Sequence, residues 1–91
     1  MDADMLTTML RGIITEGRAE TIKTSLNRRR FMGFYHDNTG IACRLEVDYA
    51  VYPHYIEVEN ATLYRGFASN NLQAAGATIA KDSFVGEYLI R

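Results

Sequence analysis

The chain has 91 residues, of which 47% are hydrophobic and 23% are charged. This is the size and composition of one small globular domain, and it excludes a disordered chain. The 10 Lys and Arg residues nearly balance the 11 Asp and Glu residues, so the chain lacks the basic excess that attracts nucleic acid. The single cysteine, Cys43, excludes an internal disulfide and a two-cysteine metal motif, and it fits a reducing compartment.

No targeting segment is visible in the sequence. The first residues, Met-Asp-Ala-Asp, are acidic where a secretory signal carries basic residues. No apolar run approaches the roughly 18 residues that crossing a bilayer requires. We therefore expect a soluble, cytoplasmic domain.

Residues 2–16 are predicted to form a helix, because their apolar side chains recur with the spacing that keeps one helix face on a core. Asp2 and Asp4 suit the positive end of the helix dipole, and Gly17 suits the position after the last turn. Gly12 lies off the apolar stripe and is expected to cost about 1 kcal/mol relative to alanine. We interpret the stripe as core-facing rather than as a methionine-rich partner groove; it consists of Met5, Leu6, Met9, Leu10, Ile13 and Ile14.

The next segment, residues 19–27, suits either a helix or a strand. Its β-branched residues are stiff at χ1 and favour the strand, with Ile22 and Leu26 on one face. A short turn at 27–29 then leads into an aromatic-rich strand at 30–36.

A long hairpin is predicted in the middle of the chain. Residues 37–40 (Asp-Asn-Thr-Gly) are a strong turn signal. Residues 41–51 then alternate between apolar and polar side chains, as in a strand with one buried face. The connection at 52–55 holds the only proline, and we expect Val51 to pair with Ile56.

The second strand of this hairpin changes phase. Ile56 and Val58 are even-numbered apolar residues, whereas Ala61 and Leu63 are odd-numbered. The change predicts a β-bulge or a sharp bend near Asn60.

After Arg65 the chain is expected to leave the sheet through residues 66–69. Asn70 and Gln73 have the spacing of a capping box, which predicts a short helix ending at Lys81. Its apolar face would consist of Leu72, Ala75, Ile79 and Ala80. Residues 84–91 are predicted to form a terminal strand, with a last helical turn as the alternative.

These elements predict a single α+β domain over residues 1–91. The sheet is expected to be mostly antiparallel with four to five strands. An N-terminal helix and a short second helix are expected to pack on one face, in the order α-β-β-β-β-α-β.

Four carboxylates form the first candidate site. The expected pairing places Asp48 opposite Glu59, with Glu46 and Glu57 as diagonal neighbours, and like charges in such positions are destabilising. This acidic strand face could meet a basic partner, bind a divalent cation or act as an acid–base pair. The alternative is a mixed surface lattice in which Arg29 lies across from Asp48, with Arg44 nearby.

The hairpin tip is the second candidate. Tyr52, His54 and Tyr55 surround Pro53, and Tyr49 lies close by. Tyrosine offers a large rigid surface with a polar end and is enriched at interface hot spots. The alternative is that Tyr49 belongs to the core and that the others shield an apolar edge.

The third candidate joins the basic run Arg28-Arg29-Arg30 to Phe31 and Tyr35. Such a group could hold phosphates and stack on bases. Successive strand residues point to opposite faces, however, so a solvated turn with one ion pair is the competing interpretation.

Cysteine, histidine and cofactor chemistry has little support. Cys43 is expected on the buried side of its strand, and His36 is near enough across the hairpin for a Cys–His pair, but no third orienting group is identifiable. We predict no catalytic residue, no metal ligand and no cofactor.

The function predicted from the sequence is a small non-catalytic module that binds another protein. Its partner-binding residues would be those of the tip and the acidic face, and it would act as an adaptor or an inhibitor. Small phage-encoded inhibitors of host defence are similar in size and general make-up. The alternatives are a nucleic-acid-binding protein that uses the arginine run, and a small metal protein or enzyme at the carboxylates. A homodimer is a further partner that an edge strand and exposed tyrosines favour.

Overall fold

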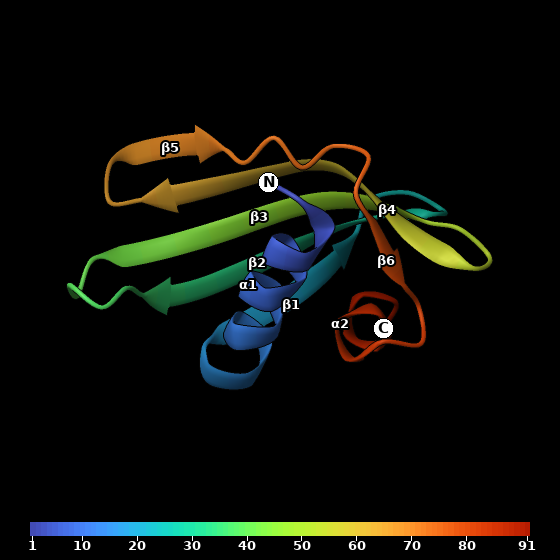
Figure 1. The fold of residues 1–91 in the computed structure, drawn as a ribbon, viewed down its shortest axis with the longest axis horizontal. Coiled ribbons are helices and arrows are strands. Elements are labelled where there is room, and N and C mark those ends of the chain that lie inside the picture. Colours follow the sequence, from blue (N-terminus) through green and yellow to red (C-terminus); the bar gives the residue numbers. More distant parts are fainter.

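The chain begins with a helix, continues through a six-stranded sheet and ends with a second helix in the computed structural model, which describes residues 1–91 (Figure 1). The elements in order are α1 (Ala3–Glu16), β1 (Arg18–Lys23), β2 (Arg28–His36), β3 (Ala42–Val51), β4 (Tyr55–Arg65), β5 (Ala68–Asn71), β6 (Thr78–Ala80) and α2 (Phe84–Leu89).

All strand pairs are antiparallel, and the strand order is β1-β2-β3-β4-β5. The short strand β6 pairs with the beginning of β4. Both helices lie on one face of the sheet, with α1 across its middle and α2 beside β6 (Figure 1). The predicted α+β class is confirmed, with an N-terminal helix, a six-stranded open sheet and a short C-terminal helix.

Helix α1 forms where the apolar stripe predicted it and buries Leu6, Leu10 and Ile13, but Met5, which was expected to face the core, is exposed. The Asp2 carboxylate caps the helix by accepting a hydrogen bond from the Met5 backbone N–H at 2.8 Å. Gly17 directly follows the last turn, as predicted, and its extended backbone (φ −99°) ends the helix. A Cβ on Gly17 would lie 2.8 Å from the Phe34 carbonyl oxygen, so glycine allows the chain to turn closely over β2.

Strand β1 confirms the strand interpretation of residues 19–27 only as far as Lys23. The predicted shared face of Ile22 and Leu26 is wrong, because Leu26 lies in the loop after the strand, where it is 88% exposed. The chain already turns after β1, since the Thr24 and Ser25 backbone N–H groups both donate to the Arg28 carbonyl. Strand β2 therefore begins at residue 28 rather than 30.

The core lies between the helices and the sheet. Strand β3 alternates as predicted, and its odd-numbered residues from Cys43 to Tyr49 face the helices. The largest fully buried side chains are those of Leu6, Leu10, Phe31, Leu45, Tyr49, Ile56 and Leu89.

The β3–β4 hairpin has the predicted register and the predicted irregularity. Val51 pairs with Ile56 and Tyr49 with Val58. The register then shifts between Asp48 and Tyr49, so that Asp48 pairs with Asn60 and Glu59 is the extra residue of a β-bulge. This bulge turns Ala61 and Leu63 toward the helices, which explains the change of phase in the sequence.

The last quarter of the chain differs from the prediction. The chain does not leave the sheet at 66–69, because Gly66, with a φ of +59°, and Phe67 form a turn into β5. Residues 72–80 do not form a helix. Asn70 lies within β5, and the Asn71 side chain accepts from the Gln73 N–H, which makes a local turn in place of a helix cap.

Residues 72–80 instead follow the edge of β4. The Leu72 N–H donates to the Ala61 carbonyl, and the Val58 N–H donates to the Ala77 carbonyl. The unpaired edge of β4 thus satisfies this segment's backbone groups, and tertiary pairing prevails over the local helical pattern.

The predicted terminal strand is also wrong, and its helical alternative is confirmed. The Ser83 hydroxyl accepts from the Gly86 N–H and caps α2, which buries Val85 and Leu89 one turn apart. Gly86 lies so close to the Ala80 carbonyl that any side chain there would collide with it.

Candidate functional site: the open face of the sheet

The face of the sheet opposite the two helices carries no covering element, and we call it the open face. Strand alternation and register place one row of side chains across it: Arg18 on β1, Phe34 on β2, Arg44 on β3 and Tyr64 on β4 are successive cross-strand partners. The other open-face residues on these strands include Glu20, Ile22, Arg28, Arg30, Met32, His36, Glu46, Asp48, Glu57, Asn60 and Thr62.

This row alternates cations with aromatic rings. The Arg44 guanidinium lies 4.2 Å from the centre of the Tyr64 ring, and the Arg18 guanidinium lies 5.3 Å from the centre of the Phe34 ring. Both distances fall within the range of a cation–π interaction. We call these four residues the cation–aromatic row.

The acidic strand face does not have the predicted arrangement. The bulge moves Glu59 out of register, so Asp48 lies opposite Asn60 rather than opposite Glu59, and Glu46 lies opposite Thr62. Glu57 lies opposite Ala50. No two of the four carboxylates are cross-strand partners, and the like-charge argument for a cluster is wrong.

Arginines pair with most of these carboxylates. Arg30 Nε lies 2.7 Å from Asp48 Oδ1 and 3.9 Å from Glu46 Oε1, and Arg28 Nε lies 3.0 Å from Glu59 Oε1. The hydrogen bonds to these carboxylates raise the pKa of both guanidinium groups. The mixed lattice proposed as the alternative is therefore present, with Arg30 in the position expected for Arg29.

Arg44 connects the lattice to the cation–aromatic row. Its Nε lies 2.9 Å from Glu46 Oε2, close enough for an ion pair although the two groups are not aligned as a hydrogen bond. Its guanidinium is thus fixed between the Glu46 carboxylate and the Tyr64 ring. The arginines of the open face are thus held by carboxylates or aromatic rings of the same face.

The hairpin tip belongs to the same face. The Tyr52 and Tyr55 rings pack with their centres 5.1 Å apart, and Tyr55 and His54 are exposed. Tyr52 lies close to Arg28 at the beginning of β2. The tip and the strand face, predicted as separate candidates, form one continuous surface.

Tyr49 is not part of that surface. Its side chain is fully buried, and its hydroxyl donates to the Leu89 carbonyl at 2.6 Å, which ties α2 to the sheet. Burial raises the pKa of the Tyr49 hydroxyl. The interpretation of Tyr49 as a core residue is confirmed.

The residues of the predicted nucleic-acid site are not brought together. Arg28 and Arg30 lie on the open face, whereas Arg29, Phe31 and Tyr35 point to the helix side. Phe31 is 0% exposed and packs edge-to-face on Tyr88, so its ring offers no surface for a base.

The Cys–His pair is not formed either. Cys43 lies opposite Tyr35 on the helix side, whereas His36 lies opposite Ala42 on the open face. Burial is the main cause that raises the pKa of Tyr35, and contact with the Cys43 thiol adds to it. No group of three or more His, Cys, Asp or Glu side chains is close enough together to hold a metal ion.

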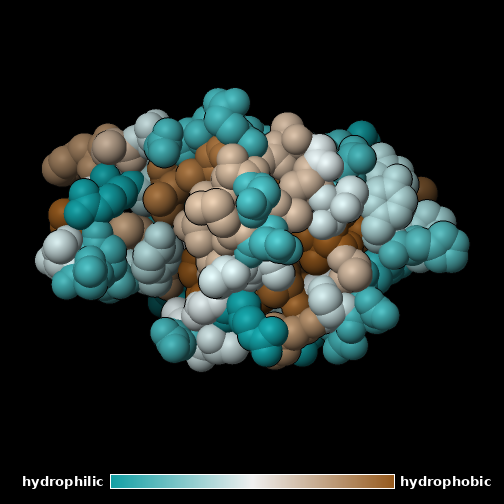
Figure 2. Space-filling view, in the orientation of Figure 1, coloured by the Kyte–Doolittle hydropathy of each residue, from teal (hydrophilic) through white to brown (hydrophobic).

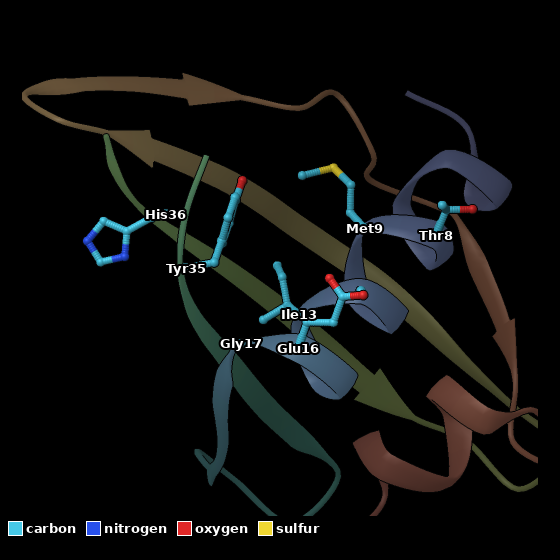
Figure 3. A pocket seen from close by; sticks show the side chains of 8 residues that line it. Thr8, Met9, Ile13, Glu16, Gly17, Tyr35 and His36 are labelled. Carbon is cyan, nitrogen blue, oxygen red and sulfur yellow. The ribbon is translucent and has the colours of Figure 1, made fainter. Parts of the chain in front are cut away.

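A groove on the helix side was not predicted from the sequence. It lies between the C-terminal half of α1 and the end of β2 and has a volume of about 510 Å³ (Figure 3). Figure 2 shows this side of the molecule, where apolar surface is exposed beside α1. Its lining residues are Thr8, Met9, Gly12, Ile13, Glu16, Gly17, Tyr35 and His36.

Comparison of the chain with protein-family models, with curated proteins and with solved structures found no match. Neither helix is long and apolar enough to cross a membrane.

Proposed function

We propose that this protein is a non-catalytic module that binds a partner protein through its open face and its tyrosine tip. The observation that carries the proposal is the cation–aromatic row, which crosses four strands on a face that no helix covers. A module of this kind acts either as an adaptor or as an inhibitor that covers a surface of its partner.

The composition of the open face supports a protein partner. Interface centres are enriched in tyrosine, phenylalanine, methionine and arginine and depleted in lysine. The strands carry arginine but no lysine on the open face. Lys23 points to the helix side, and Lys81 reaches the Pro53 carbonyl at the tip. Tyrosine and arginine are also the side chains that most often dominate binding energy.

The fixed positions of these side chains also support a protein partner. Arg30 and Arg44 are already fixed by carboxylates, and Tyr64 lies under the Arg44 guanidinium. Immobilising a free side chain at an interface costs about 0.5–1.5 kcal/mol. A face whose long side chains are already held in place loses less conformational entropy on binding.

The charges favour a protein over a nucleic acid. The arginines of the open face are matched by Glu20, Glu46, Asp48, Glu57 and Glu59. A polyanion is bound by an excess of positive charge, which this face lacks. A protein surface that presents both signs is the complementary partner.

The proposal is tested by affinity capture with a tagged chain, followed by intact mass measurement of the complex. The test variant is Arg44→Ala/Tyr64→Ala, which breaks the cation–aromatic row. The matched control is Met5→Ala, which truncates a 57% exposed side chain on α1. We expect the wild-type and control chains to retain the same protein, or a second copy of the chain, and the double variant to lose it. Capture by a double variant with an unchanged circular dichroism spectrum would contradict the proposal.

A further inference from the structure

The groove between α1 and β2 has an apolar floor and an acidic end. Figure 3 shows Met9, Ile13 and Tyr35 around the space between the helix and the strand, with the Glu16 carboxylate beside Ile13. His36 points away from this space. An occupant of the groove therefore meets aliphatic and aromatic carbon first and a carboxylate at one end.

Gly12 forms part of the groove wall, although no contact within the chain requires a glycine at this position. A Cβ built on Gly12 would have no atom within 4 Å, and its backbone is ordinary helix. Gly33 is different, because a Cβ there would lie 2.5 Å from the Ile13 side chain. Packing therefore requires glycine at position 33 but not at position 12, where glycine is a poorer helix former than alanine. The absent side chain at position 12 widens the groove, and no other part of the chain fills the space.

Glu16 gives the groove an uncompensated negative charge. It lies in the last turn of α1, where the helix dipole is negative and an acidic side chain is unfavourable. That turn holds no basic residue, and Glu16 takes part in none of the ion pairs of the molecule. The nearest arginine in sequence, Arg18, lies over the Phe34 ring on the open face. A cation from outside would be attracted both by the carboxylate and by the helix end.

We propose that this groove receives a lysine or arginine side chain of a partner protein. The aliphatic stem lies beside Gly12 on Met9 and Ile13, and the charged head reaches the Glu16 carboxylate. Long basic side chains combine an apolar stem with a charged head in this way. The Tyr35 ring lines the same groove and offers a face to the cation. The inference rests on the proposed protein-binding function, but it concerns the helix side of the molecule rather than the open face.

The test is an NMR titration of the full chain at low ionic strength. The probe is N-acetyl-lysine methylamide, and the matched control is N-acetyl-norleucine methylamide, which has an apolar chain and no charge. We expect saturable shifts at the backbone amides of Gly12, Glu16, Gly17 and Tyr35 with the lysine probe, and weaker shifts with the norleucine control. No saturable shift, or equal shifts with both compounds, would overturn the inference.

Two pairs of variants locate the effect. Glu16→Gln should weaken the lysine response by about twofold to fivefold, the range of an exposed ion pair. Glu20→Gln removes a carboxylate from the open face and should leave the response unchanged. Gly12→Leu should fill the groove and abolish the response, whereas Thr15→Leu, on the exposed side of the same helix, should retain it. A full response in the folded Glu16→Gln variant would contradict the assigned role of the carboxylate.

The outcome can be separated from that of the open-face proposal. Arg44→Ala/Tyr64→Ala does not touch the groove and should titrate with the lysine probe like the wild type. If the wild-type titration fails while the open face still captures a partner, only the groove inference is wrong. If the titration succeeds while the double variant keeps its partner, only the open-face proposal is wrong.

Discussion

Replacing Gly12 by alanine should make the protein more stable. In the interior of a helix, glycine is about 0.8–1.0 kcal/mol less favourable than alanine. The added methyl group would meet no atom within 4 Å, so neither a clash nor a new contact offsets this gain. The free energy of unfolding should therefore rise by about 1 kcal/mol, which corresponds to a midpoint about 4–8 °C higher for a domain of this size.

Urea denaturation followed by circular dichroism measures this change directly. The midpoint should move to higher urea while the slope stays the same, because the surface exposed on unfolding hardly changes. Gly33→Ala is the matched comparison, since its methyl group would lie 2.5 Å from Ile13 Cγ2 and 2.8 Å from Phe31 Cε1. That variant should lose about 1–3 kcal/mol through overpacking. If Gly12→Ala is no more stable than the wild type, the fold itself requires this glycine, and the reasoning about the groove fails.

The remaining predictions concern two groups that the fold holds in place. Tyr49→Phe removes the donor to the Leu89 carbonyl and should cost about 1–2 kcal/mol, with faster hydrogen exchange in α2, whereas Tyr55→Phe should be neutral. Because the pKa of Tyr49 is raised, its contribution is complete below pH about 10 and is lost as the pH rises further; urea midpoints at alkaline pH should fall less in Tyr49→Phe than in the wild type. Hydrogen bonds from Thr39, then from Arg65 and the Ile41 N–H, lower the pKa of Asp37. Its contribution is present above pH about 4 and is lost as the pH falls through the native pKa, so acid titration of stability should flatten below pH 4 in Asp37→Asn. An identical acid profile in that variant would contradict this role.

The hairpin shows how far the sequence predicts this fold. The odd-numbered apolar residues of β3 repeat over a whole strand, and a pattern of that length fixes which face is buried. The switch from Val58 to Ala61 on β4 likewise predicts the bulge. The same bulge moved Glu59 by one position, so the charge pairs inferred for a regular ladder were wrong although the irregularity itself was predicted. An apolar pattern predicts which face of one strand is buried. A side-chain pair between two strands can be predicted only if their register is known to the residue.

The helix predicted for the segment from Leu72 to Ala80 is wrong for a different reason. Its local pattern suits a short helix, but the edge of β4 presents unpaired backbone groups that the segment satisfies as an extended chain. This information lies in the partner strand and not in the segment. The Ser83 cap of α2, by contrast, is a local signal that was readable in the sequence and was outweighed by the apolar residues that follow it.

The candidate surfaces were partly predictable. The tyrosine tip follows from composition and from the single proline, and the structure adds that it continues into the open face. The cation–aromatic row required the registers of three hairpins at once. The predicted register, with Arg29 opposite Asp48, would place Phe34 opposite Cys43, whereas the structure pairs Phe34 with Arg44. A shift of one residue therefore hid the row from the sequence.

The central claim is that the open face binds a partner protein, and the most direct test is the affinity of the captured partner for matched variants. Isothermal calorimetry would compare the wild type, Met5→Ala and Arg44→Ala/Tyr64→Ala. If Arg44 and Tyr64 form a binding hot spot, their removal costs at least about 2 kcal/mol of binding free energy. The double variant should then bind at least about 30-fold more weakly, while Met5→Ala binds like the wild type. Equal affinity of a folded double variant and the wild type would contradict the account.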